Sequence, residues 1–211
     1  MNAHEFWHES ITQASWQRLQ EISGEIDCVV IGGWATWLWT RQHKSRGIDI
    51  VVSHKGLAAL REKYPLEKND RLAKYEVKME GFDLDIYVPY YSKLELPAED
   101  LIREEVAIEG IRTISCESLL ILKQGAQIAR QGSVKGKKDV IDILSILIHA
   151  PFHFGKYMAA LKKYKKERLL NELRAAINEF DPRESGHYLG IPYREFAKRK
   201  SDLIGKIRAL R

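Results

Sequence analysis

The residues best suited to chemistry in this chain lie between Val29 and Ser53. An apolar run ends in the pair Gly32-Gly33, and an apolar strand predicted over 48–52 then carries Asp49. Glycines at a strand-to-helix turn allow backbone N–H groups to approach a ligand closely, and the helix N-terminus behind them favours phosphate. A carboxylate on the next strand would direct oxygen ligands to the same place, where a divalent cation could join it to phosphate groups. The segment therefore predicts a site for a metal-bound nucleoside triphosphate.

A second predicted strand, over 82–88, carries two further aspartates. Asp83 and Asp85 are two residues apart, so both side chains lie on one face of the strand and the apolar residues between them lie on the other. The alternative interpretation is a solvent-exposed strand face with two ordinary aspartates.

The motifs of this chain resemble those of a known superfamily. The glycine pair satisfies neither the dinucleotide-binding pattern nor the P-loop pattern. Followed by Asp49, it resembles the core of the nucleotidyltransferase (polymerase-β-like) superfamily, in which a Gly-Gly or Gly-Ser pair at a helix start precedes a strand with Asp-x-Asp. This chain reads Gly47-Ile48-Asp49 there, so glycine replaces the first carboxylate. Lys123 and the stretch Lys138-Asp139-Val140-Ile141-Asp142 are similar to the Lys and Lys-Asp-x-x-Asp segments of AbiEii-type and related archaeal nucleotidyltransferases.

This resemblance, over roughly residues 26–149, implies a fold and a set of site residues. The fold would be α/β (α+β), with a mixed β-sheet packed against helices and a C-terminal helical region. Asp49 and Asp85 would be catalytic and would bind Mg²⁺ or Mn²⁺, and Asp139 and Asp142 would support their helix or orient basic partners. The residues expected to contact the nucleotide are Gly32, Gly33, Ser45, Arg46 and Lys123.

The implied reaction is transfer of a nucleoside monophosphate from an NTP to a hydroxyl acceptor. The family likeness makes RNA or tRNA the leading acceptor, and it extends to a toxin-like role with an antitoxin-like protein partner. The alternative is a catalytically inactive homologue that binds nucleotide or RNA, because Gly47 removes one metal ligand. A third interpretation is structural, with the basic helices serving only oligomerisation.

Charge is distributed unevenly along the 211 residues. Residues 151–211 contain 15 Lys and Arg against 7 Asp and Glu, whereas residues 1–150 contain 19 against 22. We therefore predict a nucleotidyltransferase-like domain over 1–150 and a basic helical region over 151–211. A basic surface attracts nucleic acid through its phosphates. Lysine-rich helices that are simply solvated are the alternative.

Cysteine content and hydropathy argue against several other classes of protein. Cys28 and Cys116 form neither a disulfide framework nor a zinc pattern, and we expect two buried, inert thiols. No apolar run reaches the roughly 20 residues that span a bilayer, and the N-terminus lacks the regions of a signal peptide. We expect no membrane association and a cytoplasmic location.

Hydrophobic periodicity predicts the remaining elements. Tryptophans crowd the first helix after the glycine pair, and we expect them to be buried against the sheet. A mobile basic turn is expected at 133–139, with Asp139 at the start of the helix that follows it. The predicted helices are 4–23, 33–42, 55–63, 116–131, 139–149, 155–179 and 193–209, and the predicted strands are 26–31, 48–52, a pair within 66–80, 82–88 and a hairpin over 106–114.

Overall fold

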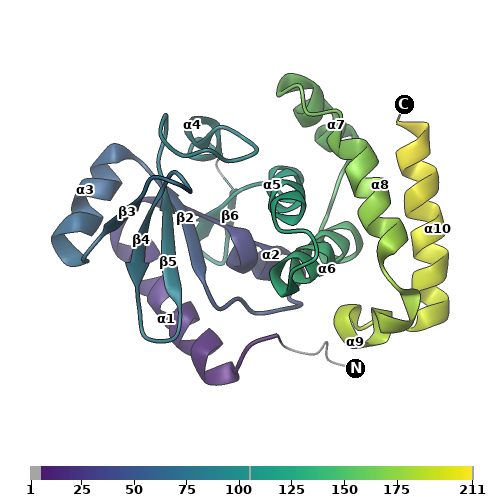
Figure 1. Ribbon diagram of the computed structural model, residues 1–211, viewed down its shortest axis with the longest axis horizontal. Coiled ribbons are helices and arrows are strands. Elements are labelled where there is room, and N and C mark those ends of the chain that lie inside the picture. The colour runs from purple at the N-terminus through teal and green to yellow at the C-terminus, as the bar shows by residue number, and fades with distance from the viewer. Residues whose placement is uncertain (1–5, 105, 211) are drawn as a thin grey trace.

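Short runs of apolar, often β-branched residues form the centre of a mixed sheet in the computed structural model, which describes residues 6–104 and 106–210. The strand order is β3-β4-β5-β2-β1-β7-β6. This mixed sheet, packed against helices, confirms the predicted α/β fold class (Figure 1). The strands are β1 (Cys28–Ile31), β2 (Ile48–Val52), β3 (Glu67–Asn69), β4 (Lys74–Lys78), β5 (Asp83–Tyr87), β6 (Val106–Ile108) and β7 (Ile111–Thr113).

The pairing of β2 is the feature that matters for function. This strand runs antiparallel to β1 and parallel to β5, and its register places Asp49 opposite Asp85. Ile48, Ile50 and the other apolar residues of β2 are buried. Side chains alternate between the faces of a sheet, so both aspartates lie on the same face.

Helices cover both faces of the sheet. Helices α1 (Glu9–Glu25) and α3 (His54–Lys63) lie on one face. On the other lie α2 (Gly32–Thr40), α5 (Cys116–Ala129) and α6 (Val134–His149) (Figure 1). A short helix, α4 (Ala98–Leu101), precedes β6.

The tryptophans of α2 are part of the packing, as expected. Trp34 is buried, donates a hydrogen bond from Nε1 to Ser15 Oγ of α1 at 2.9 Å, and contacts the rings of Trp16 and Trp37. Trp39 donates to the carbonyl of Ile114 at 2.9 Å. This cluster joins α1 and α2 and fixes the position of the glycine turn at the start of α2.

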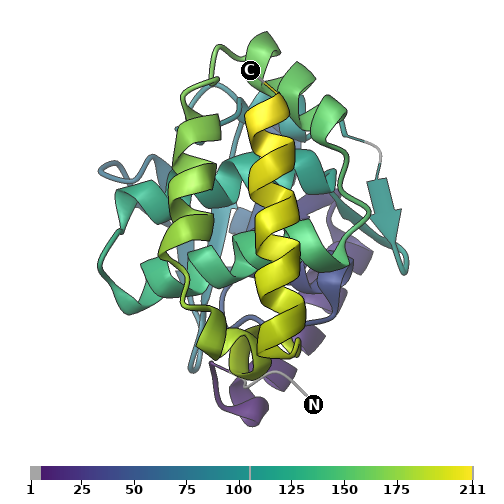
Figure 2. The same ribbon diagram turned by 90° about the vertical axis from the view of Figure 1, so that its right-hand side faces the viewer.

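The C-terminal helices pack on α5 and α6 rather than on the sheet. Figure 2 shows α8 and α10 side by side across them. Their apolar side chains belong to the same core as the sheet, and Gln124 of α5 bonds both to the Tyr157 hydroxyl and to the Leu169 carbonyl. The domain boundary near residue 150 stays a prediction. The elements after it are α7 (Phe154–Lys163), α8 (Leu169–Glu179), the 3₁₀ helix η1 (Pro182–Glu184), α9 (Ser185–Leu189) and α10 (Tyr193–Ala209).

Three predicted helices differ from those observed. The helix predicted over 4–23 is α1, which begins only at Glu9, and residues 4–5 of that prediction lie outside the described part of the chain. The segment 155–179 is two helices, because the chain turns at Lys165, which has a left-handed φ of 56°. Helix α6 begins at Val134 rather than at Asp139, because Ser133 Oγ caps it by accepting the N–H of Gly136 at 3.0 Å. The expected basic turn is therefore the first part of a helix, which fixes its lysines.

The cysteines agree with the sequence analysis. Cys28 and Cys116 are buried free thiols, and burial raises the pKa of Cys28 to about 11 and that of Cys116 to about 12. Among the described residues, none of the helices combines the length and the apolar composition that crossing a bilayer requires.

The close approach of α6 to the end of α5 can be tested at Gly136. A Cβ there would collide with the carbonyl oxygen of Arg130, which is backbone and cannot move aside easily. We expect Gly136→Ala to lower the free energy of unfolding by about 1–3 kcal/mol, although alanine is the better helix former. Gly205→Ala in α10 is the matched control, because its Cβ would meet no atom within 4 Å. That variant should be about 1 kcal/mol more stable than wild type in urea unfolding, and equal effects at the two positions would contradict the prediction.

Candidate active site

The glycine pair is required by side chains that pack against it. Gly32 has a left-handed φ of 68°, and a Cβ there would overlap the carboxylate of Asp49. A Cβ at Gly33 would overlap the hydroxyl of Ser45, which donates to the carbonyl of Gly47 at 3.0 Å. Gly33 lines the pocket described below, whereas Gly32 packs against Asp49. The turn therefore brings the start of α2 into direct contact with the acidic strand.

Asp49 and Asp85 lie on neighbouring parallel strands, whose spacing is about 4.8 Å. Burial and the charge of Asp85 raise the pKa of Asp49 to about 6, against the opposing effects of Lys123, Lys74 and Arg130. Burial also raises the pKa of Asp85, although Lys74 opposes this. The two carboxylates repel each other in a partly desolvated place, and a cation between them would relieve that repulsion.

Lys74 on β4 is a residue of this site that the sequence analysis missed. Its Nζ lies 2.6 Å from Asp85 Oδ2 and 2.9 Å from Glu76 Oε1, and its side chain is only 11% exposed. Burial opposes the charge of Lys74, but Asp85 and Glu76 outweigh burial and raise its pKa. Lys74 holds one oxygen of Asp85 and leaves Oδ1 for a ligand. The sequence shows that Lys74 and Glu76 are two residues apart and so lie on one face of a strand. That this face lies beside Asp85 becomes clear only once the register of β4 and β5 is known.

A cationic wall, formed by Lys123, Arg130 and Lys138, faces these carboxylates from α5 and α6. Asp142, which is fully buried, bonds to Lys123 at 2.6 Å and to Lys138 at 2.8 Å. Burial opposes the charged form of Lys123, but Asp142 and Asp139 outweigh burial and raise its pKa. Burial and the neighbouring Lys123 instead lower the pKa of Lys138.

Asp139 completes this wall, and its position corrects the expected helix-capping role. It is buried within α6 and accepts two hydrogen bonds from Arg130, at 2.6 and 3.0 Å. The wall thus holds three cationic groups against two carboxylates, Asp139 and Asp142, and keeps one positive charge in excess. The resemblance implied that these two aspartates orient basic partners, and their hydrogen bonds to the basic residues agree with this. Lys123 is buried and lies close to both aspartates, so much of its charge is already balanced.

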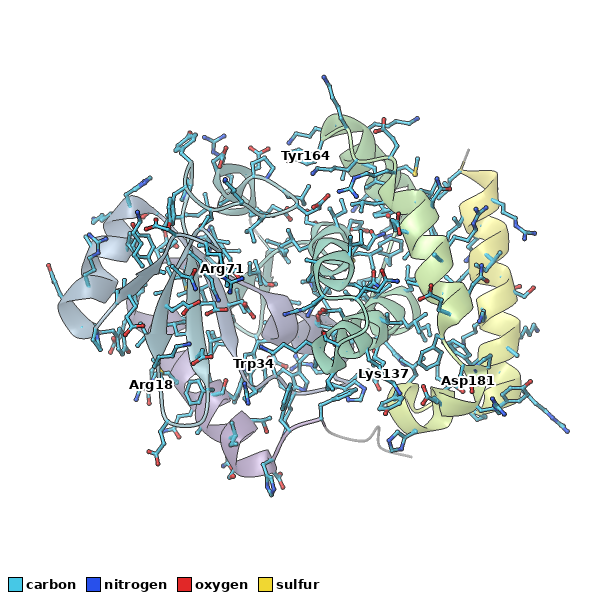
Figure 3. The ribbon with its side chains drawn as sticks, in the orientation of Figure 1. Arg18, Trp34, Arg71, Lys137, Tyr164 and Asp181 are labelled. Carbon is cyan, nitrogen blue, oxygen red and sulfur yellow. The ribbon has the colours of Figure 1, made fainter. Side chains whose placement is uncertain are left out.

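The cationic wall and the opposite wall, which is the face of the sheet that carries Asp49 and Asp85, enclose a pocket of about 130 Å³ that opens to solvent. Lys135, near the start of α6, also lines it, whereas Lys137 turns towards η1, where it pairs with Glu184 at 3.0 Å (Figure 3). Trp7 and Lys135 are lining residues that the sequence analysis did not select. Of the predicted site residues, the pocket brings together Gly33, Ser45, Arg46, Asp49, Asp85 and Lys123.

Gly47 lies where the resemblance expects a carboxylate, and the structure has room for a side chain there. A Cβ at Gly47 would lie 3.6 Å from the carbonyl oxygen of Asp83, an ordinary contact. Asp83 also lines the pocket, but its side chain is 43% exposed and pairs with Lys78 at 3.3 Å. Among residues 6–104 and 106–210, no group of three or more His, Cys, Asp or Glu side chains is arranged to hold a metal.

Two adjacent carboxylates nevertheless fit one magnesium ion. Mg²⁺ usually keeps several waters and is held by one or two protein carboxylates together with phosphate oxygens of the substrate. Asp49 and Asp85 meet this requirement, and their raised pKa values reflect negative charge that such an ion would stabilise. The residues that would hold the ion are therefore Asp49 and Asp85.

The raised pKa of Asp49 predicts a pH-dependent effect on stability. The folded protein keeps a proton on Asp49 up to about pH 6, whereas the unfolded chain releases it near 3.8, so the destabilisation by ionisation is absent below pH 4, grows as the pH rises from 4 to 6, and is complete above that range. In EDTA, we expect Asp49→Asn to raise the free energy of unfolding by roughly 2 kcal/mol at pH 7.5 and to have no effect at pH 4. Denaturant unfolding at both pH values measures this. Asp202→Asn, at an exposed position of α10, is the control, and an equal gain at both pH values would contradict the prediction.

Comparisons with known proteins found a likeness among solved structures. No protein-family model matches the sequence, and no curated protein matches it. Among solved structures, the chain is similar to the crystal structure of an antigenic nucleotidyltransferase-like protein from Paracoccidioides brasiliensis. The sequence identity is 22% and the TM-score 0.41, over 78% of this chain and 92% of that chain. At this level of similarity, the function has to be inferred from the residues of the pocket.

Proposed function

We propose that this protein is a metal-dependent nucleotidyltransferase, which transfers a nucleoside monophosphate from an NTP to a hydroxyl acceptor. The observation that carries the proposal is the register of β2 and β5, which sets Asp49 beside Asp85 and opposite the cationic wall. Carboxylates suit a magnesium ion and ammonium or guanidinium groups suit phosphates, so one pocket offers both kinds of contact that a magnesium–triphosphate complex needs.

The reaction is a substitution at the α-phosphorus. The acceptor oxygen forms a bond to that phosphorus, the bond to the bridging oxygen breaks, and pyrophosphate leaves with the electron pair. The proton of the acceptor hydroxyl passes to a carboxylate of the site or to water. A bound Mg²⁺ would supply charge neutralisation for the phosphate oxygens.

The chain's own residues mainly position groups and balance charge. Lys74 holds Oδ2 of Asp85, so the remaining oxygen keeps a fixed direction. Asp142 and Asp139 hold Lys138, Lys123 and Arg130 in place before any ligand binds. Groups that are already oriented stabilise developing charge without a further cost of reorganisation.

RNA is the acceptor we favour, on the basis of charge. The corner between α7 and α8 presents Lys162, Lys163, Lys165 and Arg168 on exposed positions, although Lys163 and Arg168 also have acidic neighbours. Basic side chains attract phosphates irrespective of sequence, which suits a polyanionic acceptor such as tRNA.

Transfer can be measured directly. The protein would be incubated with each α-³²P-labelled NTP, Mg²⁺ or Mn²⁺, and total RNA, and the labelled products separated by size. We expect label on RNA that EDTA abolishes and that Asp49→Asn reduces by more than about a hundredfold, the scale of losing one electrostatic contact to the transition state. Asp202→Asn should retain full activity. Absence of transfer to RNA and to the protein itself, together with absence of NTP binding by calorimetry, would remove the proposal.

The second candidate is a homologue that binds nucleotide or RNA without transferring anything, and Gly47 is the observation that favours it. Loss of one carboxylate removes a metal ligand. Because a Cβ fits at this position, Gly47→Asp can restore the carboxylate without displacing backbone. If the wild-type protein is inactive but binds NTP, transfer by Gly47→Asp would indicate an inactivated enzyme. Absence of transfer by a Gly47→Asp variant that folds and binds NTP would support the binding protein. Gly47→Asn is the matched uncharged control.

A further inference from the structure

Two residues that line the pocket, Trp7 and Arg46, are not used by the reaction described above, and we call this pair the rim. Both residues are half-buried. The guanidinium carbon of Arg46 lies 4.9 Å from the centre of the Trp7 ring, the distance of a cation–π contact. The two side chains are therefore in contact with each other at the pocket.

The segment that carries Trp7 is held on both sides. Its neighbour Phe6 stacks on Tyr188 of α9, with ring centres 5.3 Å apart, and meets the edge of His43 at 5.2 Å. Helix α1 begins two residues after Trp7 and packs against α2 through Trp34. Contacts outside the pocket therefore hold Trp7 at the pocket. A side chain that is already held in place loses little conformational entropy when a ligand binds.

The rim and the carboxylates can contact one ligand. Trp7 and Arg46 line the same pocket as Asp49 and Asp85. The charged end of a triphosphate would bind between the carboxylates and the cationic wall, so its sugar and base would extend towards the rim. Aromatic and guanidinium planes both stack on nucleobases, and they do so with little dependence on base identity.

We propose that Trp7 and Arg46 form a nucleobase-binding subsite, on which the base of the incoming NTP stacks. This inference rests on the proposed function, because it assigns the base of the same nucleotide. Trp7 carries the base on its indole face, and Arg46 extends the stack rather than serving as a phosphate ligand. Since every base has a flat face, the subsite recognises a nucleotide as opposed to a bare polyphosphate and discriminates weakly among bases.

The test compares a ligand that has a base with one that has none. Binding of a non-hydrolysable ATP analogue and of inorganic tripolyphosphate, each with Mn²⁺, would be measured by calorimetry for wild type, Trp7→Ala, Trp7→Phe and Arg46→Lys. We expect Trp7→Ala to weaken binding of the analogue by about tenfold and to leave tripolyphosphate unchanged, with Trp7→Phe retaining most of the affinity. Arg46→Lys keeps the charge but loses the plane, so it should also weaken only the analogue. Tyr193→Ala, an exposed aromatic of α10, is the matched control.

Each other outcome overturns the subsite. Equal affinity of the wild type for the two ligands would show that the base contributes nothing, while leaving the proposed function intact. Equal weakening of both ligands by Trp7→Ala would show that Trp7 supports the pocket as a whole, and Trp7→Phe separates this from a folding defect. Loss of binding to a short single-stranded RNA, with no loss for the analogue, would assign the rim to the acceptor. Failure of the wild type to bind either triphosphate would remove the proposed function as well.

Discussion

The pairing of β2 with β5 is the constraint on which the candidate site depends. Parallel pairing in this register sets Asp49 directly beside Asp85 on a face of the sheet that is covered by helices. Burial raises the pKa of both carboxyls, and the charge of Asp85 adds to the rise at Asp49, so the arrangement is unfavourable. A ligand that offsets the repulsion would explain such an arrangement, and this is the reason why we propose cation and phosphate binding at the pocket.

The glycine turn and the acidic strand are two parts of one arrangement. The carboxylate of Asp49 occupies the space that a side chain at Gly32 would need, and Ser45 does the same at Gly33. The glycines therefore allow the acidic strand to approach the N-terminus of α2, in addition to any contact with phosphate. A substitution at either glycine would displace Asp49 or the loop before it, so the turn would affect the proposed metal site even if it never touched a nucleotide.

The sequence predicted the parts of the site that depend on local patterns. The glycine pair, Asp49 in an apolar strand and Asp85 on an alternating strand all follow from spacing within a few residues, and the structure brings them together. Lys74 was missed because its role comes from a cross-strand pairing whose register no local pattern fixes. Asp139 was misjudged because a serine six residues earlier caps the helix, which leaves Asp139 inside it as the partner of Arg130. The roles of these residues in catalysis stay predictions.

The balance of charge argues for one cation rather than two. With glycine at position 47, the sheet contributes Asp49 and Asp85, and Lys74 already neutralises part of the latter. Two carboxylates, one of which already pairs with Lys74, provide too few ligands to hold a pair of divalent ions without help. Phosphate oxygens of the substrate would have to supply the other ligands, so ion and nucleotide would bind as one complex. In the proposed complex, the excess positive charge of the cationic wall, fixed by Asp142 and Asp139, would meet the phosphates while the carboxylates meet the ion.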